Sequence, residues 1–336
     1  MWLKNPGIYI GCCIFLFVVT YKDFRKIRIS GYAQGTTYHI TYYAADSIVT
    51  QQQIDSILDK IDSSLSLYKS YSLINQFNVS ERGVEMDKHF KNVLNKSIET
   101  YRATNGLFDI TVQPLVQAWG FGVTKSDTIP TGALLNAIKE CVGSDLLQVK
   151  DNYLLKKKSC VRIDMNGVAQ GYSVDVIADF LEKNRIVNYI VELGGELRVK
   201  GRNHATGEKM KIGIESPSKS AFDDESLENV ISVDKGAVTT SGSYRKFYES
   251  NGKKITHLID PTTGYPVQNE LISVTICAND AITADAYDNA LMLMGLDKAL
   301  QFVQKRKDLE AYFIYQKSNG EIADTASRGF YKVLVH

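Results

Sequence analysis

The chain has 336 residues, of which 44% are hydrophobic and 23% are charged, so it can bury the core of one large domain or of two small ones. Its formal net charge is +1, and basic residues do not cluster beyond the N-terminal segment. Because affinity for phosphate backbones comes from clustered Lys and Arg, the sequence argues against nucleic-acid binding.

The five cysteines indicate neither a zinc site nor a disulfide framework. Cys12 and Cys13 lie in an apolar run, and Cys141, Cys160 and Cys277 occur singly in segments predicted to belong to the core. The sequence contains no CxxC pair and no His/Cys cluster.

Residues 1–24 are predicted to be a signal anchor or an uncleaved signal segment. Residues 8–19 form an uninterrupted apolar run, which is short for a membrane span, although Trp2 and Tyr21 can extend it at the interfaces. No small-x-small cleavage site follows closely, which favours a retained anchor. Basic residues after the run outnumber those before it, and the positive-inside rule alone would keep the following domain in the cytoplasm.

Residues 25–336 are predicted to form a single globular domain of the α+β class. Strand-like runs are not regularly interleaved with crossover helices, which favours largely antiparallel or mixed sheets with packed helices over a doubly wound fold. In the first half, Thr50 and Gln53 form a predicted capping box, and Asn105-Gly106 is a predicted helix end. The predicted elements there are strands within residues 25–44 that turn at 33–35, helices over 50–65, 90–105 and 131–142, and a hairpin over 146–155.

The second half is predicted to contain more strands than helices. Residues 65–78 and 107–122, earlier in the chain, lack a clear periodicity. The predicted elements are a buried strand over 160–164, a helix over 168–181, strands over 189–193, 196–200, 210–214, 230–233 and 271–278, a helix from a cap at 279 or 280 through 294, a helix over 296–305, and final strands over 311–315 and 330–335.

Two polar segments could contact an anionic ligand. Residues 164–175 run from a strand through a glycine-bearing turn into a helix, whose exposed N–H groups can face a phosphate. The segment lacks the Lys-Ser/Thr pair of a Walker loop, and a GxxxG spacing alone is more often a close-packing device. Residues 239–245 place several hydroxyls around Ser241 and Gly242, which can bind an anion or form an ordinary polar turn.

A third candidate site is the pair Asp285 and Asn289, one turn apart on a predicted helix. Two oxygen donors on one face suit Mg²⁺. Taken alone, however, the pair is better explained by the favourable interaction of an Asp with the positive end of a helix.

The fourth candidate is the segment from 257 to 266, which two prolines and a glycine hold in a rigid loop. In isolation it is most simply a stiffened turn with a hydrogen-bonded histidine. Together with the other segments, His257 becomes a candidate base for a hydroxyl nucleophile, and Asp260 a carboxylate that orients it or shares the proton transfer. A phosphate-bearing substrate, a divalent cation and a base are the requirements for attack on phosphorus.

Seven motifs, in order, resemble those of the ApbE family of FAD:protein FMN transferases, over nearly everything after the anchor. The family's Asp-x-x-Gly-x-Ala-Lys-Gly-Tyr-x-x-Asp signature resembles residues 164–175, and its His-x-Ile-Asp-Pro-x-Thr-Gly-x-Pro loop resembles residues 257–266. The other five resemble residues 33–36, 66–74, 108–122, 240–244 and 284–290.

The resemblance implies that residues 25–336 form a flavin transferase domain that binds FAD and Mg²⁺. It would move FMN from FAD onto a Thr or Ser hydroxyl of an acceptor flavoprotein and release AMP, with His257 as the base. Acceptors of the family are subunits of membrane redox pumps and related extracytoplasmic proteins. The resemblance therefore implies attachment to the inner membrane with the domain on the periplasmic side. Mg²⁺ would be held by Gly167, Asp285 and Asn289, and FAD by Gln34, Tyr68, Leu107, Phe108, Asp109, Asp164, Gln170, Ser241, Gly242 and Ile259.

Three residues depart from the family pattern. Gln34 replaces Met at the flavin rim, Gln170 replaces a Lys that could meet the diphosphate, and Asn289 replaces a Thr ligand of the metal. Two alternatives remain open from the sequence: a Mg²⁺-dependent FAD diphosphatase, in which water takes the place of the acceptor hydroxyl, and a membrane-anchored flavin-binding protein without turnover.

Overall fold

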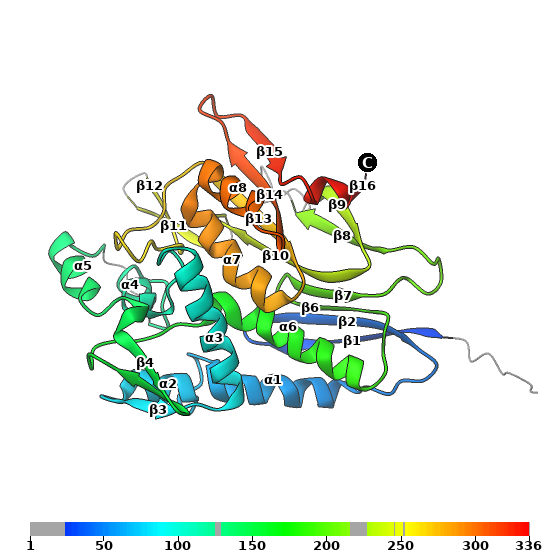
Figure 1. Ribbon diagram of the computed structural model, residues 1–336, viewed down its shortest axis with the longest axis horizontal. Coiled ribbons are helices and arrows are strands. Elements are labelled where there is room, and N and C mark those ends of the chain that lie inside the picture. Colours follow the sequence, from blue (N-terminus) through cyan, green and yellow to red (C-terminus); the bar gives the residue numbers. More distant parts are fainter. Residues whose placement is uncertain (1–23, 125–128, 216–226, 245, 251–252, 336) are drawn as a thin grey trace, which may run out of the picture.

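The central feature of the structure is an eight-stranded sheet with the order β1-β2-β6-β7-β10-β13-β14-β15 (Figure 1). The computed structural model describes residues 24–124, 129–215, 227–244, 246–250 and 253–335. Every neighbouring pair in this sheet is antiparallel, which confirms the predicted α+β class. The strands are β1 Arg25–Ala33, β2 Thr36–Ala44, β6 Tyr189–Leu193, β7 Glu196–Lys200, β10 Lys235–Gly242, β13 Leu271–Ala278, β14 Leu309–Gln316 and β15 Ile322–Ala326.

The described residues also form three smaller sheets. The first contains β16 (Leu334–Val335), β9 (Leu227–Val233) and β8 (Met210–Glu215), the second β3 (Gly83–Glu85), β5 (Tyr153–Lys156) and β4 (Leu147–Lys150), and the third β11 (Phe247–Ser250) and β12 (Lys253–Thr256).

Helices cover one face of the central sheet, and the β8-β9-β16 sheet covers part of the other (Figure 1). Strand β14 shows why both faces are buried: Ala311 and Phe313 pack with α7 and α8, whereas Tyr312 and Ile314 pack with β8 and β9. The helices are α1 Gln51–Leu65, α2 Leu73–Val79, α3 Lys88–Ala103, α4 Gln113–Ala118, α5 Gly132–Lys139, α6 Asn166–Lys183, α7 Ala281–Met294 and α8 Leu296–Gln304.

Local signals in the sequence are confirmed at several turns and helix ends. Thr50 and Gln53 form the predicted capping box at the start of α1. The β1-β2 hairpin turns through Gln34 and Gly35, with φ of 53° and 78°, and α3 is followed by Asn105 and Gly106, with φ of 52° and 86°. Left-handed backbone at these positions explains why Gly and amide side chains occupy them.

Two predicted strands are wrong. Residues 160–164 form no strand, because the side-chain amide of Asn78 occupies the backbone of Ile163: Nδ2 donates to its carbonyl at 2.9 Å, and Oδ1 accepts from its N–H at 2.8 Å. Residues 330–335 form the 3₁₀ helix Phe330–Lys332 before the two-residue strand β16. Helices α2 and α4 and strands β3, β11 and β15 were not predicted, since all are short and none has a long periodic pattern.

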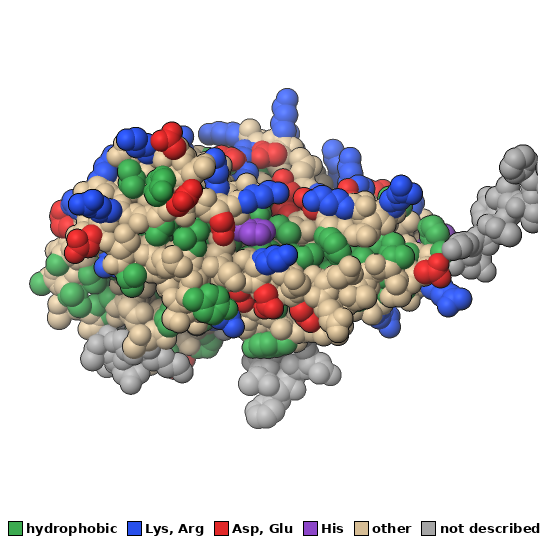
Figure 2. All heavy atoms as spheres, turned by 90° about the horizontal axis from the view of Figure 1, so that it is seen from below, with side chains coloured by type: hydrophobic (Ala, Val, Ile, Leu, Met, Phe, Trp, Pro, Cys, Tyr) green, Lys and Arg blue, Asp and Glu red, His purple; other side chains and the backbone are tan. Residues whose placement is uncertain are grey.

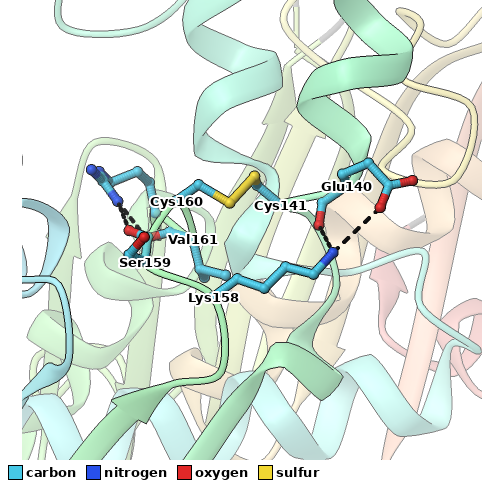
Figure 3. Close-up of a disulfide and its surroundings, with 7 residues drawn as sticks. Glu140, Cys141, Lys158, Ser159, Cys160 and Val161 are labelled. Atoms are coloured by element: carbon cyan, nitrogen blue, oxygen red, sulfur yellow. Dashed lines mark hydrogen bonds and ion pairs between the residues drawn. A yellow bond between two sulfur atoms is a disulfide. The ribbon is translucent and has the colours of Figure 1, made fainter.

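The structure also corrects the interpretation of the cysteines, because Cys141 and Cys160 form a disulfide (Figure 3). Their Cα atoms are 5.6 Å apart and their sequence separation is 19. Cys160 is exposed and Cys141 is half-buried, so neither lies in the core as expected. The bridge ties the end of α5 to the segment that leads into α6. Beside it, Lys158 Nζ donates to the Glu140 carbonyl at 2.7 Å.

The predicted anchor, residues 1–24, lies outside the described residues except for Phe24. Among the residues that are described, no helix is long and apolar enough to cross a membrane. Basic and acidic side chains are interspersed on the face of the molecule shown in Figure 2, without a broad field of one sign.

Candidate active site

A cavity of about 260 Å³ brings together segments that are far apart in the sequence. Asp285 of α7 and His257, which follows β12, line the same cavity. The predicted metal and flavin residues that line it are Tyr68, Leu107, Phe108, Asp109, Asp164, Gly167, Gln170, Ser241, Ile259 and Asn289.

Close packing between α6 and α7 brings Asp285 into this cavity. The Gly171 N–H donates to Asp285 Oδ2 at 2.8 Å. A Cβ at Gly171 would lie 2.3 Å from the Ala281 carbonyl oxygen and 2.7 Å from Asp285 Cβ, so only glycine allows this approach. Gly171 therefore allows α6 and α7 to pack closely, and this close packing places Asp285 in the cavity.

The predicted Mg²⁺ ligands lie around an irregular turn of α6. Gly167 departs from helical geometry, with φ of −77° and ψ of 18°. A Cβ there would lie 3.0 Å from Asn289 Nδ2. Asn289 Oδ1 accepts a hydrogen bond from Ser241 Oγ at 2.9 Å, and the second lone pair of this oxygen can still coordinate a cation.

The chemistry of this donor set fits a hard cation. Burial, against the opposing hydrogen bond from the Gly171 N–H and with a smaller contribution from the charge of Asp175, raises the pKa of Asp285 to about 7. A nearby cation would offset this cost and stabilise the carboxylate. No group of three or more His, Cys, Asp or Glu side chains within the described ranges forms a metal site. A Mg²⁺ ion here would therefore depend on the Asn289 amide and the Gly167 carbonyl beside Asp285.

His257 is held as a neutral base. Its Nδ1 lies 3.0 Å from the Lys246 carbonyl oxygen, which can only accept, so Nδ1 carries the proton and Nε2 keeps its lone pair. Burial lowers the pKa of His257 below its ordinary value, as does the charge of Lys246, and the hydrogen bond to the carbonyl opposes both. The ring of Phe121 packs edge-on against the imidazole, with centroids 6.3 Å apart.

Asp260 shapes the loop and does not line the cavity. Its Oδ1 accepts hydrogen bonds from the N–H and the hydroxyl of Thr262, at 2.7 and 2.6 Å. The partner that orients His257 is thus the Lys246 carbonyl and not the predicted carboxylate. The loop is also tied to the segment before α5, because Trp119 Nε1 donates to the Gly264 carbonyl at 2.8 Å.

Two of the predicted flavin contacts, Asp109 and Asp164, accept hydrogen bonds from other residues of the protein. Both oxygens of Asp109 accept from the backbone and side chains of Thr111 and Ser144. Asp164 Oδ1 accepts from the Asn166 N–H at 2.8 Å, and its backbone N–H donates to the Ile110 carbonyl. These carboxylates hold the cavity wall in position, and burial raises the pKa of each.

Gln34 and Gly242 do not line this cavity. Gly242 lies in β10, where a Cβ would be 2.6 Å from the ring of Tyr244. Gln34 donates to Ser173 Oγ at 2.9 Å and lines a second cavity of about 620 Å³. The two cavities adjoin, since Tyr68, Asn166, Gln170 and Lys246 line both.

Sequence reasoning missed several residues of the wall. Lys246 lies next to the hydroxyl-rich segment 239–245 but outside it, and Glu196 belongs to no polar cluster in the sequence. Asp288 lies within residues 284–290 but was not predicted as a site residue. Phe121 falls in a stretch that is too apolar for a solvated loop, which is a usable signal. The missed apolar residues are Ile110, Val112, Val116, Phe121, Leu258, Pro261 and Leu293.

The fold and the site together define an enzyme. A neutral histidine, a buried carboxylate beside an irregular helical turn and an apolar wall surround one cavity, which is the arrangement of a site for proton transfer on a bound organic ligand.

Comparisons with known proteins identify the family. The model of the ApbE family matches residues 34–313. The FAD:protein FMN transferase of Haemophilus influenzae is 35% identical over 319 residues, covering 91% of each chain. That of Vibrio cholerae is 35% identical over 318 residues, covering 92% of this chain and 94% of the relative. The structure of flavin transferase ApbE from Vibrio cholerae matches with a TM-score of 0.82 at 32% identity, over 92% of this chain and 99% of its own. The chain belongs to the ApbE family and is a transferase.

Proposed function

We propose that this protein is a Mg²⁺-dependent FAD:protein FMN transferase that moves FMN from FAD onto a Thr or Ser hydroxyl of an acceptor flavoprotein and releases AMP. The observation that carries the proposal is that Asp285 and His257 line one cavity. The adjoining second cavity, at about 620 Å³, falls in the range of roughly 300–1,000 Å³ that is usual for small-molecule sites. The names of the relatives support the same activity.

In the proposed reaction, Nε2 of His257 takes the proton of the acceptor hydroxyl. The acceptor oxygen then forms a bond to the phosphorus of the FMN half, and the bond from that phosphorus to the bridging oxygen breaks. The electron pair of the broken bond leaves with AMP. A lowered pKa keeps His257 in the basic form near neutral pH, and the Lys246 carbonyl fixes its tautomer.

Asp285, the Asn289 amide and the Gly167 carbonyl would hold Mg²⁺. When bound, the ion neutralises the charge of the diphosphate. Before it binds, the buried Asp285 must lose its proton.

One assay tests the proposal. The full-length protein is incubated with FAD, Mg²⁺ and an acceptor flavoprotein domain, and AMP and acid-stable flavin on the acceptor are measured. AMP together with labelled acceptor is the expected result. AMP with free FMN would instead show a diphosphatase, and bound FAD without AMP would show a binding protein; either outcome overturns the proposal.

We further propose that residues 1–24 anchor the protein in the inner membrane with the domain on the periplasmic side. The disulfide between Cys141 and Cys160 supports this orientation, because such bonds persist in oxidising compartments and are rare in the cytosol. A reporter fused after His336 tests it: an alkaline-phosphatase fusion should be active. An inactive phosphatase together with an active cytoplasmic reporter would refute the orientation.

The same location would bring the site to extracytoplasmic acceptors, which we propose to be subunits of membrane redox pumps or related flavoproteins. The measurement is labelling of such a subunit in membranes that contain the protein. Absence of flavin on every extracytoplasmic flavoprotein of those membranes would count against this partner class.

A further inference from the structure

The boundary between the two cavities has one full positive charge. Of the residues that line both cavities, Tyr68, Asn166 and Gln170 are neutral, and Lys246 is an exposed cation. Lys246 is also the only Lys or Arg that lines the first cavity within the described part of the chain.

The walls around this boundary carry many carboxyl groups. Those of the first cavity are Asp109, Asp164, Glu196, Asp285 and Asp288, and those of the second are Asp55, Asp59 and Asp62. In such surroundings a diphosphate is repelled unless a cation lies close to it. Bound Mg²⁺ would supply part of this charge, and the ammonium of Lys246 is the protein's own contribution.

We infer that Lys246 pairs with the diphosphate of FAD where the two cavities meet, and that it selects diphosphate-bearing flavins over riboflavin. The inference rests on the proposed function, since it takes FAD to be the ligand. The diphosphate of a dinucleotide links its two halves, so a ligand that occupies both cavities places its diphosphate at their boundary. Gln170, at the same boundary, can donate a hydrogen bond but carries no charge.

A competing explanation assigns Lys246 to the protein alone. Its charge lowers the pKa of Asp164, against the larger effect of burial. If Lys246 served only to stabilise the negative charge of Asp164, removing the ammonium group would leave the affinity for FAD unchanged.

The side chain of Lys246 can be tested without disturbing the base. The contact with His257 Nδ1 is made by the Lys246 backbone carbonyl, which every substitution keeps. The substitutions are Lys246→Met, which removes the charge at similar length, and Lys246→Arg, which retains it. Lys298→Met is the matched control, because Lys298 is exposed and lines neither cavity.

The experiment measures the Kd of the full-length protein for FAD and for riboflavin from the quenching of flavin fluorescence, at several NaCl concentrations and without an acceptor. For Lys246→Met, we expect the Kd for FAD to rise about tenfold, as for loss of one charge-assisted hydrogen bond, and its dependence on salt to weaken. Lys246→Arg and Lys298→Met should stay within about threefold of the wild type. Riboflavin affinity should not change in any variant, which also shows that each variant is folded. Adding Gln170→Lys to Lys246→Met should restore affinity for FAD.

An unchanged Kd for FAD in Lys246→Met would overturn the inference, as would an equal loss of riboflavin binding. Failure of the transferase proposal would look different: the wild type would bind FAD with the Lys246 dependence intact but release no AMP in the presence of Mg²⁺ and acceptor.

Discussion

Replacing both Cys141 and Cys160 by serine should lower the free energy of unfolding by about 3 kcal/mol. The bridge closes a loop with a sequence separation of 19, and the chain-entropy relation for a loop of that length gives about this value at 25 °C. The effect arises mainly in the unfolded chain, which gains freedom when the bond is absent.

The disulfide also joins two segments that lead to the candidate active site. On one side, α5 packs against the 257–266 loop, where a Cβ at Gly264 would lie 3.3 Å from Lys139 Cδ. On the other side, the segment after Cys160 leads to Asp164 and α6. That segment is also held by the Ile163 and Asp164 backbone hydrogen bonds, so we expect FAD affinity to fall by less than about threefold.

The assay is equilibrium unfolding in guanidinium chloride, followed by far-UV circular dichroism, for the oxidised wild type, the reduced wild type and the double serine variant. The reduced wild type should match the variant. Cys277→Ser is the matched control, because Cys277 has no disulfide partner. A difference below about 1 kcal/mol between oxidised wild type and variant would refute the reasoning.

The remaining predictions concern the site. His257→Ala should lower the rate of AMP release by about 10² to 10⁴ while FAD stays bound, and undiminished release would mean that another group is the base. Mg²⁺ affinity, measured by calorimetry between pH 5.5 and 8, should rise with pH and level off above about 7, because burial raises the pKa of Asp285 to about 7; a flat profile would contradict this. Since the unfolded chain has the ordinary pKa of 3.8, the contribution of Asp285 to stability should be present at low pH and lost between about pH 4 and 7, and Asp285→Asn should remove this slope in urea unfolding. Gly171→Ala should lower the free energy of unfolding by about 1–3 kcal/mol, measured by thermal unfolding, and weaken Mg²⁺ binding, because the new Cβ would lie 2.3 Å from the Ala281 carbonyl oxygen. Gly167→Ala should lower it by less, because the nearest contact is a side-chain amide at 3.0 Å. A larger loss for Gly167→Ala than for Gly171→Ala would refute the packing argument.

The site was partly predictable because its motifs lie on locally determined elements. Asp285 and Asn289 share a helix face by their spacing alone, and two prolines and a glycine hold the backbone near His257. The partner of His257 was not predictable, since a backbone carbonyl carries no sequence signal. Lys246 was missed as a boundary residue because its position depends on the tertiary structure: two cavities meet beside it.

By itself, the sequence determined the elements whose signals are local. The capping box of α1, the turn at Gln34-Gly35 and the end of α3 at Asn105-Gly106 depend on neighbouring residues, whose geometry the chain imposes. Only the tertiary structure decided the Cys141–Cys160 pairing and the replacement of a strand by the Asn78 amide at Ile163. Each of these joins residues that are distant in the chain, and their approach is set by the packing of the whole core, which no local pattern encodes.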